Sequence, residues 1–267
     1  MRGIRSGDLG WLAAVLSMAT ALLGPWPALA QNATPAAQGE PTVSLTREEF
    51  QTQIQEDLQY TEAETPGGVF VDSSISDIQS MHPFLAEEET TIGVIGLVYE
   101  TLVGGDPRTG TIAPTALADY WEIAPDNRTY IFHLNQDAKW HDGTDFTAQD
   151  VAFSADALAN PDSASAYHGS FVDTFESWRA IDDNTFELVA REPKFTTLYD
   201  LLSLYILPKH LWDNIPIADW QFDPAASGSA PSRVVGTGPF KVVEYQPRRQ
   251  LVVERFDGYW GPKARAD

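Results

Sequence analysis

The chain has 267 residues, enough for one large domain or two ordinary ones, and its 43% hydrophobic and 21% charged residues exclude a wholly disordered or fibrous protein. With 38 acidic and 17 basic residues the formal net charge is −21, so nucleic acid and anionic membrane surfaces are not expected partners, because both require a basic face. The absence of cysteine excludes disulfides, cysteine nucleophiles, thiolate metal sites and lipid attachment to an N-terminal cysteine.

The first 30 residues have the pattern of a secretory signal peptide. Arg2 and Arg5 precede a mostly apolar stretch at 9–23, and Ala28-Leu29-Ala30 places small residues at the two positions that a signal peptidase reads. The apolar stretch is about 15 residues long, shorter than the roughly 18–20 that a membrane anchor needs. We therefore predict cleavage after Ala30 and a periplasmic or extracellular protein.

Residues 31–66 are predicted to form a flexible leader that contains one short amphipathic helix. Thr46 and Glu49 have the spacing of a capping box, and Phe50, Ile54 and Leu58 follow at four-residue intervals. A run of apolar residues at 69–71, after a Pro-Gly-Gly break, is the first candidate strand.

The rest of the chain predicts a mixed α/β protein, because segments with a helical period alternate with segments of period two. The expected elements are a helix carrying Ile92, Ile95, Val98 and Leu102; a hairpin of 121–123 and 129–134; a helix from the cap Thr147 with Asp150 to Asn160-Pro161; a hairpin of 178–181 and 185–189; a helical segment within 195–212; a surface loop or linker at 223–232; and strands at 240–245 and 250–255.

Motifs for catalysis and cofactors are weak. Gly236-Thr237-Gly238 lacks the third glycine of a dinucleotide site, and Pro239 removes an amide donor, so a tight entry to the next strand is the better interpretation. One local cluster could offer a nitrogen and carboxylate oxygens to a metal: His141, Asp142, Asp145 and Asp150. A β-turn leading into the helix after Thr147 explains it better. We expect no catalytic residues, no metal and no cofactor.

Three segments carry a more specific pattern: residues 97–154, which run from LVYETLVGGDP to HDGTDFTAQDVAFS; residues 206–212, ILPKHLW; and residues 236–261, GTGPFKVVEYQPRRQLVVERFDGYWG. In this order they resemble blocks of bacterial extracellular solute-binding protein family 5, the peptide- and nickel-binding family of ABC importers. Ser76-Asp77 through His82-Pro83 is similar to the family's first-strand segment. The resemblance covers about residues 67–263.

The resemblance implies a periplasmic-binding-protein-like fold of the class II type. The chain would form one α/β lobe with mixed sheets, with an incomplete base subdomain at 67–83 and 172–267 and a smaller inserted subdomain at 84–171. A second lobe would be absent, so we expect the chain to be an N-terminal fragment of a longer protein. Ligand would be held by closure of two lobes, since only the closed state makes contacts from both.

The resemblance also implies a function and a set of ligand-binding residues. The protein would be the substrate-binding component of an ABC importer, a monomer that captures dipeptides, oligopeptides or a similar small solute and delivers it to a membrane permease and ATPase. The candidate ligand residues are Ser80, Met81, Tyr99, Glu100, Gly236, Thr237 and Gly238. Glu100 could accept the amino terminus of a peptide, whereas the Gly-Thr-Gly segment is better explained as architecture. Two alternatives remain open: a secreted metal-assisted hydrolase that uses His141 and nearby acids, and a binding module with a sensory or chaperone role.

Overall fold

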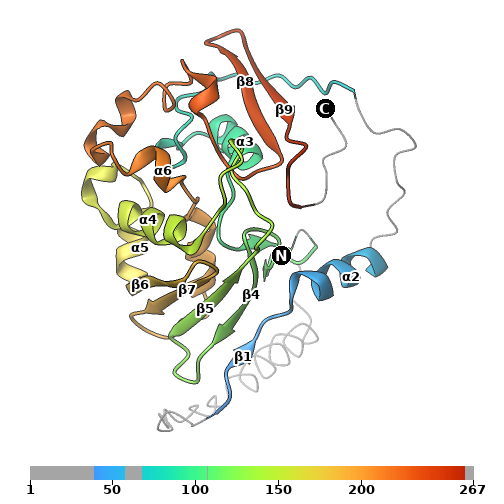
Figure 1. Ribbon diagram of the computed structural model, residues 1–267, viewed down its shortest axis with the longest axis vertical. Coiled ribbons are helices and arrows are strands. Elements are labelled where there is room, and N and C mark those ends of the chain that lie inside the picture. The colour runs from blue at the N-terminus through green and yellow to red at the C-terminus, as the bar shows by residue number, and fades with distance from the viewer. Residues whose placement is uncertain (1–38, 58–67, 107, 262–267) are drawn as a thin grey trace, which may run out of the picture. The chain divides into compact units, whose positions relative to one another are not determined.

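The structure is a computed structural model in which residues 39–57, 68–106 and 108–261 are described (Figure 1). The predicted signal peptide, its cleavage site and the first residues of the leader lie outside the described residues. Within the described ranges, no helix has both the length and the apolar character that crossing a membrane requires.

A five-stranded antiparallel sheet is the largest element of the fold (Figure 1). Its strands follow the order β1-β4-β5-β7-β6, with β1 at Thr42–Val43, β4 at Ala118–Ile123, β5 at Thr129–Leu134, β6 at Phe175–Asp182 and β7 at Thr185–Ala190. Burial alternates along β5 and β7, so that every second side chain enters the core. Both predicted hairpins are confirmed.

Helices pack on this sheet through their apolar sides. Helix α4 (Ala148–Ala159) contacts β6 and β7, and α5 (His168–Thr174) contacts α4 and β6. As predicted, α4 begins after Thr147, whose backbone N–H donates to Asp150 Oδ2 at 2.9 Å. It ends before Pro161, which opens the 3₁₀ turn η2 (Pro161–Ser163).

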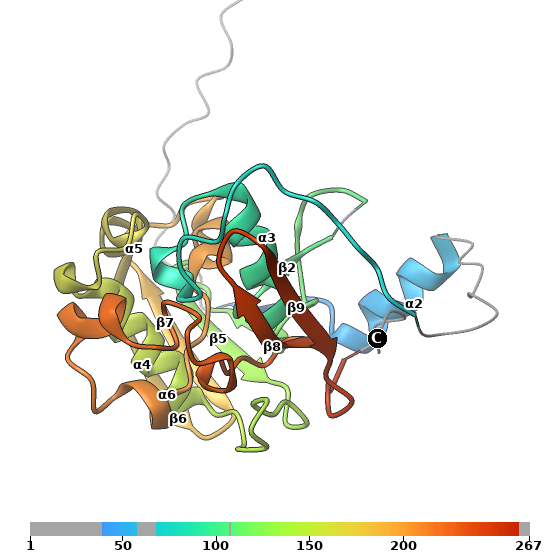
Figure 2. The same cartoon turned by 90° about the horizontal axis from the view of Figure 1, so that it is seen from above.

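A second group of elements is built around α3 (Glu89–Val98), which lies beside the antiparallel hairpin of β8 (Phe240–Gln246) and β9 (Gln250–Arg255) (Figure 2). The two strands agree with the sequence prediction, and so does the helix as far as Val98, whereas Leu102, expected on the same helical face, lies beyond the end of α3. The remaining elements are short: η1 (Pro83–Leu85), η3 (Thr197–Ser203), α6 (Lys209–Trp212), η4 (Ile217–Phe222), η5 (Pro231–Arg233), and a two-stranded sheet of β2 (Gly104–Gly105) and β3 (Ile112–Ala113).

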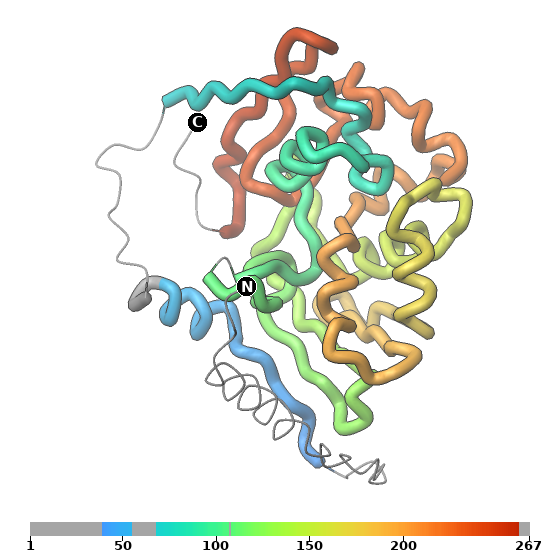
Figure 3. Tube along the Cα trace, turned by 180° about the vertical axis from the view of Figure 1, so that it is seen from behind, coloured from blue at the N-terminus to red at the C-terminus, as the bar shows by residue number. Residues whose placement is uncertain are grey.

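The described part of the predicted leader joins the sheet (Figure 3). Strand β1 pairs with the end of β4, and the Ser44 N–H continues the pairing by donating to Trp121 O at 2.9 Å. Helix α2 (Arg47–Asp57) follows, and its capping box is present: Thr46 N donates to Glu49 Oε2 at 2.8 Å and Glu49 N donates back to Thr46 Oγ1 at 3.3 Å. The helix was predicted from the sequence; the strand was not.

Three predicted elements are wrong or incomplete. Residues 69–71 form no strand: their side chains are more than three quarters exposed, and none of the strands in the described ranges pairs with them. Residues 195–212 do not form one helix: η3 is 3₁₀, and α6 is a separate four-residue helix that begins after Pro208. The predicted surface loop at 223–232 is anchored inside, since Ala225 and Ala226 are buried.

The predicted boundary between residues 171 and 172 passes through α5, and the strands on either side of it share one sheet. Strand β5, from the predicted inserted subdomain, pairs with β7, from the predicted base, from Thr129↔Val189 to His133↔Thr185. Strand pairing therefore links the two predicted subdomains, and their division stays a prediction.

Candidate ligand site

The predicted ligand residues fall into two separate contact groups. In the first, Met81 N donates to Ala226 O at 2.7 Å and Ser80 Oγ donates to the same carbonyl at 3.2 Å. The Met81 side chain is only 1% exposed and belongs to the core. These contacts fix the chain before η1 to the segment around Ala226, and the role of the two residues in ligand binding stays a prediction.

The second group comes together where α3 ends. Gly238 N donates to Val98 O at 2.9 Å, and the Tyr99 side chain fills the core beside this contact. The approach is so close that a Cβ built on Gly236 would lie 1.8 Å from Val98 O. Only glycine fits there. The segment Gly236-Thr237-Gly238 is thus a close backbone contact, which agrees with its interpretation as architecture.

His141 fastens this segment from the other side. Its Nδ1 accepts the Gly236 N–H at 3.2 Å, and its Nε2 lies 2.9 Å from Gly238 O and donates to it. The ring must therefore be neutral, and burial lowers the pKa of His141 to about 4. Both ring nitrogens are occupied by backbone groups, so neither is available to a metal.

The acids of the local cluster at 142–150, which could have offered oxygens to a metal, point to different partners. Asp142 Oδ2 lies 2.8 Å from His210 Nε2, and Asp145 pairs with Lys139. Asp150 accepts the backbone N–H groups of Thr147 and Lys209. Among the residues that the structure describes, no three His, Asp or Glu side chains converge on a point where a metal ion could bind.

Glu100 is enclosed by protein donors that the sequence analysis did not assign to a site. Its Oε1 accepts the Tyr259 hydroxyl at 2.8 Å and its Oε2 accepts the Trp260 Nε1–H at 3.1 Å. Burial raises the pKa of Glu100 to about 7, although these donors, the buried Thr237 hydroxyl and the charge of Arg47 all act in the opposite direction. Because both oxygens already accept bonds, the assignment of Glu100 to a peptide amino terminus stays a prediction.

Arg47 connects this group to the N-terminal segment. Its guanidinium carbon lies 4.3 Å from the centre of the Trp260 ring, and its Nε donates to Asp119 Oδ1 at 2.7 Å. Tyr259 and Trp260 lie in the segment 236–261 that carries the family resemblance, but they are not among the predicted ligand residues. The sequence signal that could have identified them is the adjacent pair of aromatic residues in Gly-Tyr-Trp-Gly. In the structure this pair packs against the buried Glu100 carboxylate.

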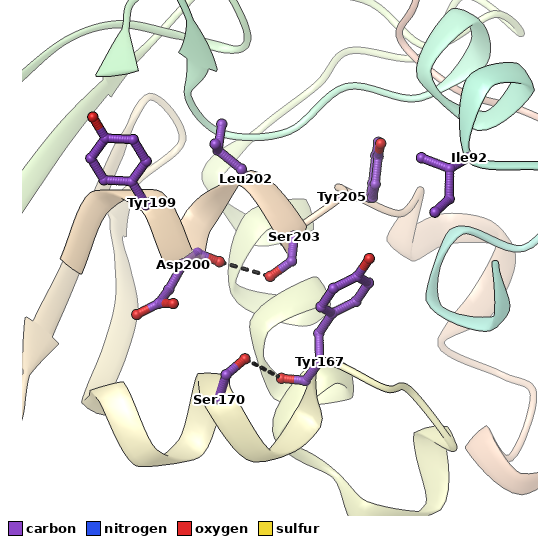
Figure 4. Close-up of a pocket in the computed structure, with 8 residues that line it drawn as sticks. All are labelled: Ile92, Tyr167, Ser170, Tyr199, Asp200, Leu202, Ser203 and Tyr205. Atoms are coloured by element: carbon purple, nitrogen blue, oxygen red, sulfur yellow. Dashed lines mark hydrogen bonds between the residues drawn. The ribbon is translucent and has the colours of Figure 1, made fainter. Parts of the chain in front are cut away.

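A pocket of about 320 Å³ opens elsewhere, between α3, α5 and η3 (Figure 4). Small-molecule sites usually range from roughly 300 to 1,000 Å³, so this volume suits a small group. Its lining is mainly tyrosine and small polar residues: Ile92, Tyr167, Ser170, Tyr199, Asp200, Leu202, Ser203 and Tyr205. The seven predicted ligand residues are not among these eight. Three distant segments form the pocket, so no single motif could have revealed it.

Hydrogen bonds to the backbone of the same helical turn hold two serines of the pocket in place (Figure 4). Ser170 Oγ donates to Tyr167 O at 3.1 Å, and Ser203 Oγ donates to Asp200 O at 2.7 Å. Burial and the neighbouring Tyr167 hydroxyl raise the pKa of Tyr205. The pocket therefore presents phenol groups on a locally fixed backbone.

The tyrosine hydroxyls of the pocket are free to bind. Within the described part of the chain, the hydroxyls of Tyr167, Tyr199 and Tyr205 form no hydrogen bond. Each can donate and accept, and each ring offers a flat apolar surface. Such a lining suits a small ligand with both polar and apolar groups.

Known proteins resemble this chain over most of its described length. Residues 113–267 match the family described as bacterial extracellular solute-binding proteins, family 5 middle. The dipeptide-binding protein of Escherichia coli is 31% identical over 210 residues, which are 71% of this chain and 38% of that protein. Two solved structures share the fold. The periplasmic binding protein DppA of Helicobacter pylori, in complex with the peptide STSA, has a TM-score of 0.65 at 30% identity over 76% of this chain and 42% of that one. The oligopeptide-binding protein AppA of Bacillus subtilis, in complex with a nonapeptide, has a TM-score of 0.68 at 23% identity over 76% and 39%.

These similarities confirm the predicted fold class, a mixed α/β periplasmic-binding-protein fold. The chain spans between 38% and 42% of the length of these three relatives. The family match covers residues 113–267, more than half of the chain. The chain therefore belongs to the bacterial extracellular solute-binding proteins of family 5.

Proposed function

We propose that this chain belongs to the extracytoplasmic substrate-binding component of an ABC importer, and that it captures peptides without catalysis. The relatives named above are a dipeptide-binding protein and two proteins solved with bound peptides. Captured peptide would pass to a membrane permease driven by an ATPase. Export through the predicted signal peptide would place the protein outside the cytoplasm, where it would encounter peptides before their import.

The open, tyrosine-lined pocket is the observation that carries this proposal. Peptides combine backbone donors and acceptors with side chains of varied polarity. The free hydroxyls of Tyr167 and Tyr205 can exchange hydrogen bonds with peptide groups, while their rings provide contact area at a small cost in side-chain entropy. His141 supports the non-catalytic assignment, since both of its ring nitrogens serve the fold.

Calorimetric titration of the complete protein that contains this chain with di- to pentapeptides tests the proposal, together with thermal unfolding in the presence and absence of each peptide. We expect binding that raises the melting temperature as RT ln(1 + [L]/Kd) requires. Tyr167→Phe removes one hydroxyl from the pocket and should weaken binding by roughly two- to tenfold, the cost of one hydrogen bond. Tyr120→Phe, on β4 away from the pocket, is the matched control and should bind like the wild type.

Mass spectrometry of the same samples separates capture from hydrolysis. We expect the peptides to be recovered intact after prolonged incubation. Cleavage that disappears in His141→Ala would contradict the proposal and support the hydrolase alternative. Absence of binding to every peptide at millimolar concentration would also reject peptide capture.

A further inference from the structure

The side chains that line the pocket carry formal charge of one sign only, negative. Among its lining residues only Asp200 carries a formal charge at neutral pH; the others are apolar, hydroxyl-bearing or phenolic. Among the described residues, no lysine, arginine or histidine lines it. An anionic group entering this pocket would meet a carboxylate and no counter-ion, whereas a cation would meet an opposite charge.

Asp200 is held in place but its charge is not neutralised. Its Oδ2 accepts the Thr174 hydroxyl at 2.8 Å, which fixes the carboxylate without compensating the charge. Across the described residues, no basic side chain forms an ion pair with Asp200. By contrast, the buried Asp106 pairs with Arg108 at 2.9 Å. Asp200 therefore remains able to pair with a ligand.

The tyrosines favour the same sign of charge. The faces of aromatic rings attract ammonium and guanidinium groups, and the free phenol oxygens accept their N–H groups. Tyr167, Tyr199 and Tyr205 all line the pocket with Asp200. The excess of 21 negative charges on the chain adds a long-range attraction for cations.

We propose that this pocket selects a positively charged group of the bound peptide, an ammonium or guanidinium, with Asp200 as its counter-ion. The inference rests on the proposed function, since it names the class of peptide that the pocket prefers. The charge can come from a lysine or arginine side chain or from the peptide's amino terminus; the chemistry of recognition is the same.

Matched tripeptides test this preference. Titration with Ala-Lys-Ala, Ala-Met-Ala and Ala-Glu-Ala varies one side chain, and N-acetyl-Ala-Met-Ala removes the terminal charge. We expect a cationic group to strengthen binding about tenfold, in line with one charge-assisted hydrogen bond. Added salt should reduce the advantage, because this pocket is open to solvent.

Asp200→Asn removes the charge and keeps an oxygen that can accept the Thr174 hydroxyl. In this variant the cationic advantage should disappear, while Ala-Met-Ala with its amino terminus acetylated should bind as it does to the wild type. Asp219→Asn, an exposed acid on η4 that does not line the pocket, is the control and should keep the advantage.

The outcomes are distinguishable. If Asp200→Asn abolishes the preference for lysine over methionine, the side chain occupies the pocket; if it abolishes only the effect of acetylation, the amino terminus does. Both results support the inference. Equal binding of all peptides, or a preference that survives in Asp200→Asn, overturns it and leaves peptide capture intact. Failure of every peptide to bind rejects the proposed function itself.

Discussion

Replacing Gly236 with alanine should destabilise the fold severely, because the new methyl group meets backbone rather than a movable side chain. Its Cβ would lie 1.8 Å from Val98 O, 2.6 Å from Val98 C and 3.2 Å from Tyr99 N. The end of α3 cannot retreat easily, since Tyr99 N donates to Ile95 O at 2.8 Å. The clash between this methyl group and Val98 can therefore be relieved only if the segment 236–238 moves away from the helix.

That movement breaks four hydrogen bonds. Gly238 N bonds Val98 O at 2.9 Å, and His141 makes three further bonds to Gly236 and Gly238 through its N–H and both ring nitrogens. At about 1 kcal/mol for each bond, the loss is about 4 kcal/mol, a large share of the 5–15 kcal/mol that stabilises a typical domain.

Urea unfolding followed by circular dichroism measures this loss. Gly93→Ala in α3 is the control, because a Cβ there meets no atom within 4 Å and alanine favours the helix by about 1 kcal/mol. We expect Gly93→Ala to raise the unfolding midpoint and Gly236→Ala to lower it or to prevent folding. A Gly236→Ala protein within 1 kcal/mol of the wild type would refute the close contact between segment 236–238 and α3.

Two further predictions concern pH. The His141 pKa of about 4 lies below the 6.5 expected in an unfolded chain, so its contribution is complete above pH 6.5 and is lost as the pH falls through 4. In urea titrations, the stability advantage of the wild type over His141→Gln should therefore shrink by about 3 kcal/mol between pH 7 and pH 4; a constant difference would contradict the buried neutral ring. Glu100 should affect stability in the opposite direction. Its pKa is about 7 in the folded protein and about 4.5 in the unfolded chain, so its contribution to stability is complete below pH 4.5 and is lost as the pH rises through 7. Relative to Glu100→Gln, the wild type should lose about 3 kcal/mol from pH 4.5 to pH 8, and parallel pH profiles would argue against its burial.

Local patterns predicted the elements whose causes are local. The capping boxes at Thr46 and Thr147 and the turn residues of both sheet hairpins act within a few residues of themselves, so the sequence was sufficient. Residues 69–71 have the composition of a strand, but a strand also requires a partner, and none of the described strands pairs with them. The composition of a segment does not show whether a second strand lies beside it in the folded protein.

The site was harder to predict for the same reason. The resemblance pointed to Tyr99, Glu100 and Gly236, and Gly236 does lie against the backbone of Val98 and Tyr99. It did not reveal that Tyr259 and Trp260 donate to both oxygens of the Glu100 carboxylate. The tyrosine-lined pocket joins α3, α5 and η3, and its members are indistinguishable in sequence from tyrosines that pack in a core. Their free hydroxyls are a property of the tertiary structure alone.

The N-terminal segment has a consequence for association between molecules. Strand β1 pairs only with Ile123 and Glu122 of β4, but the Arg47 side chain extends this cover by donating to Ala118 O at 3.0 Å and to Ala116 O. The two residues of β1, Ser44 and one guanidinium thus cover this side of β4. An uncovered edge of this kind pairs readily with another chain. We therefore expect the segment 39–57 to limit edge-to-edge pairing between molecules, a role that its polar composition does not suggest.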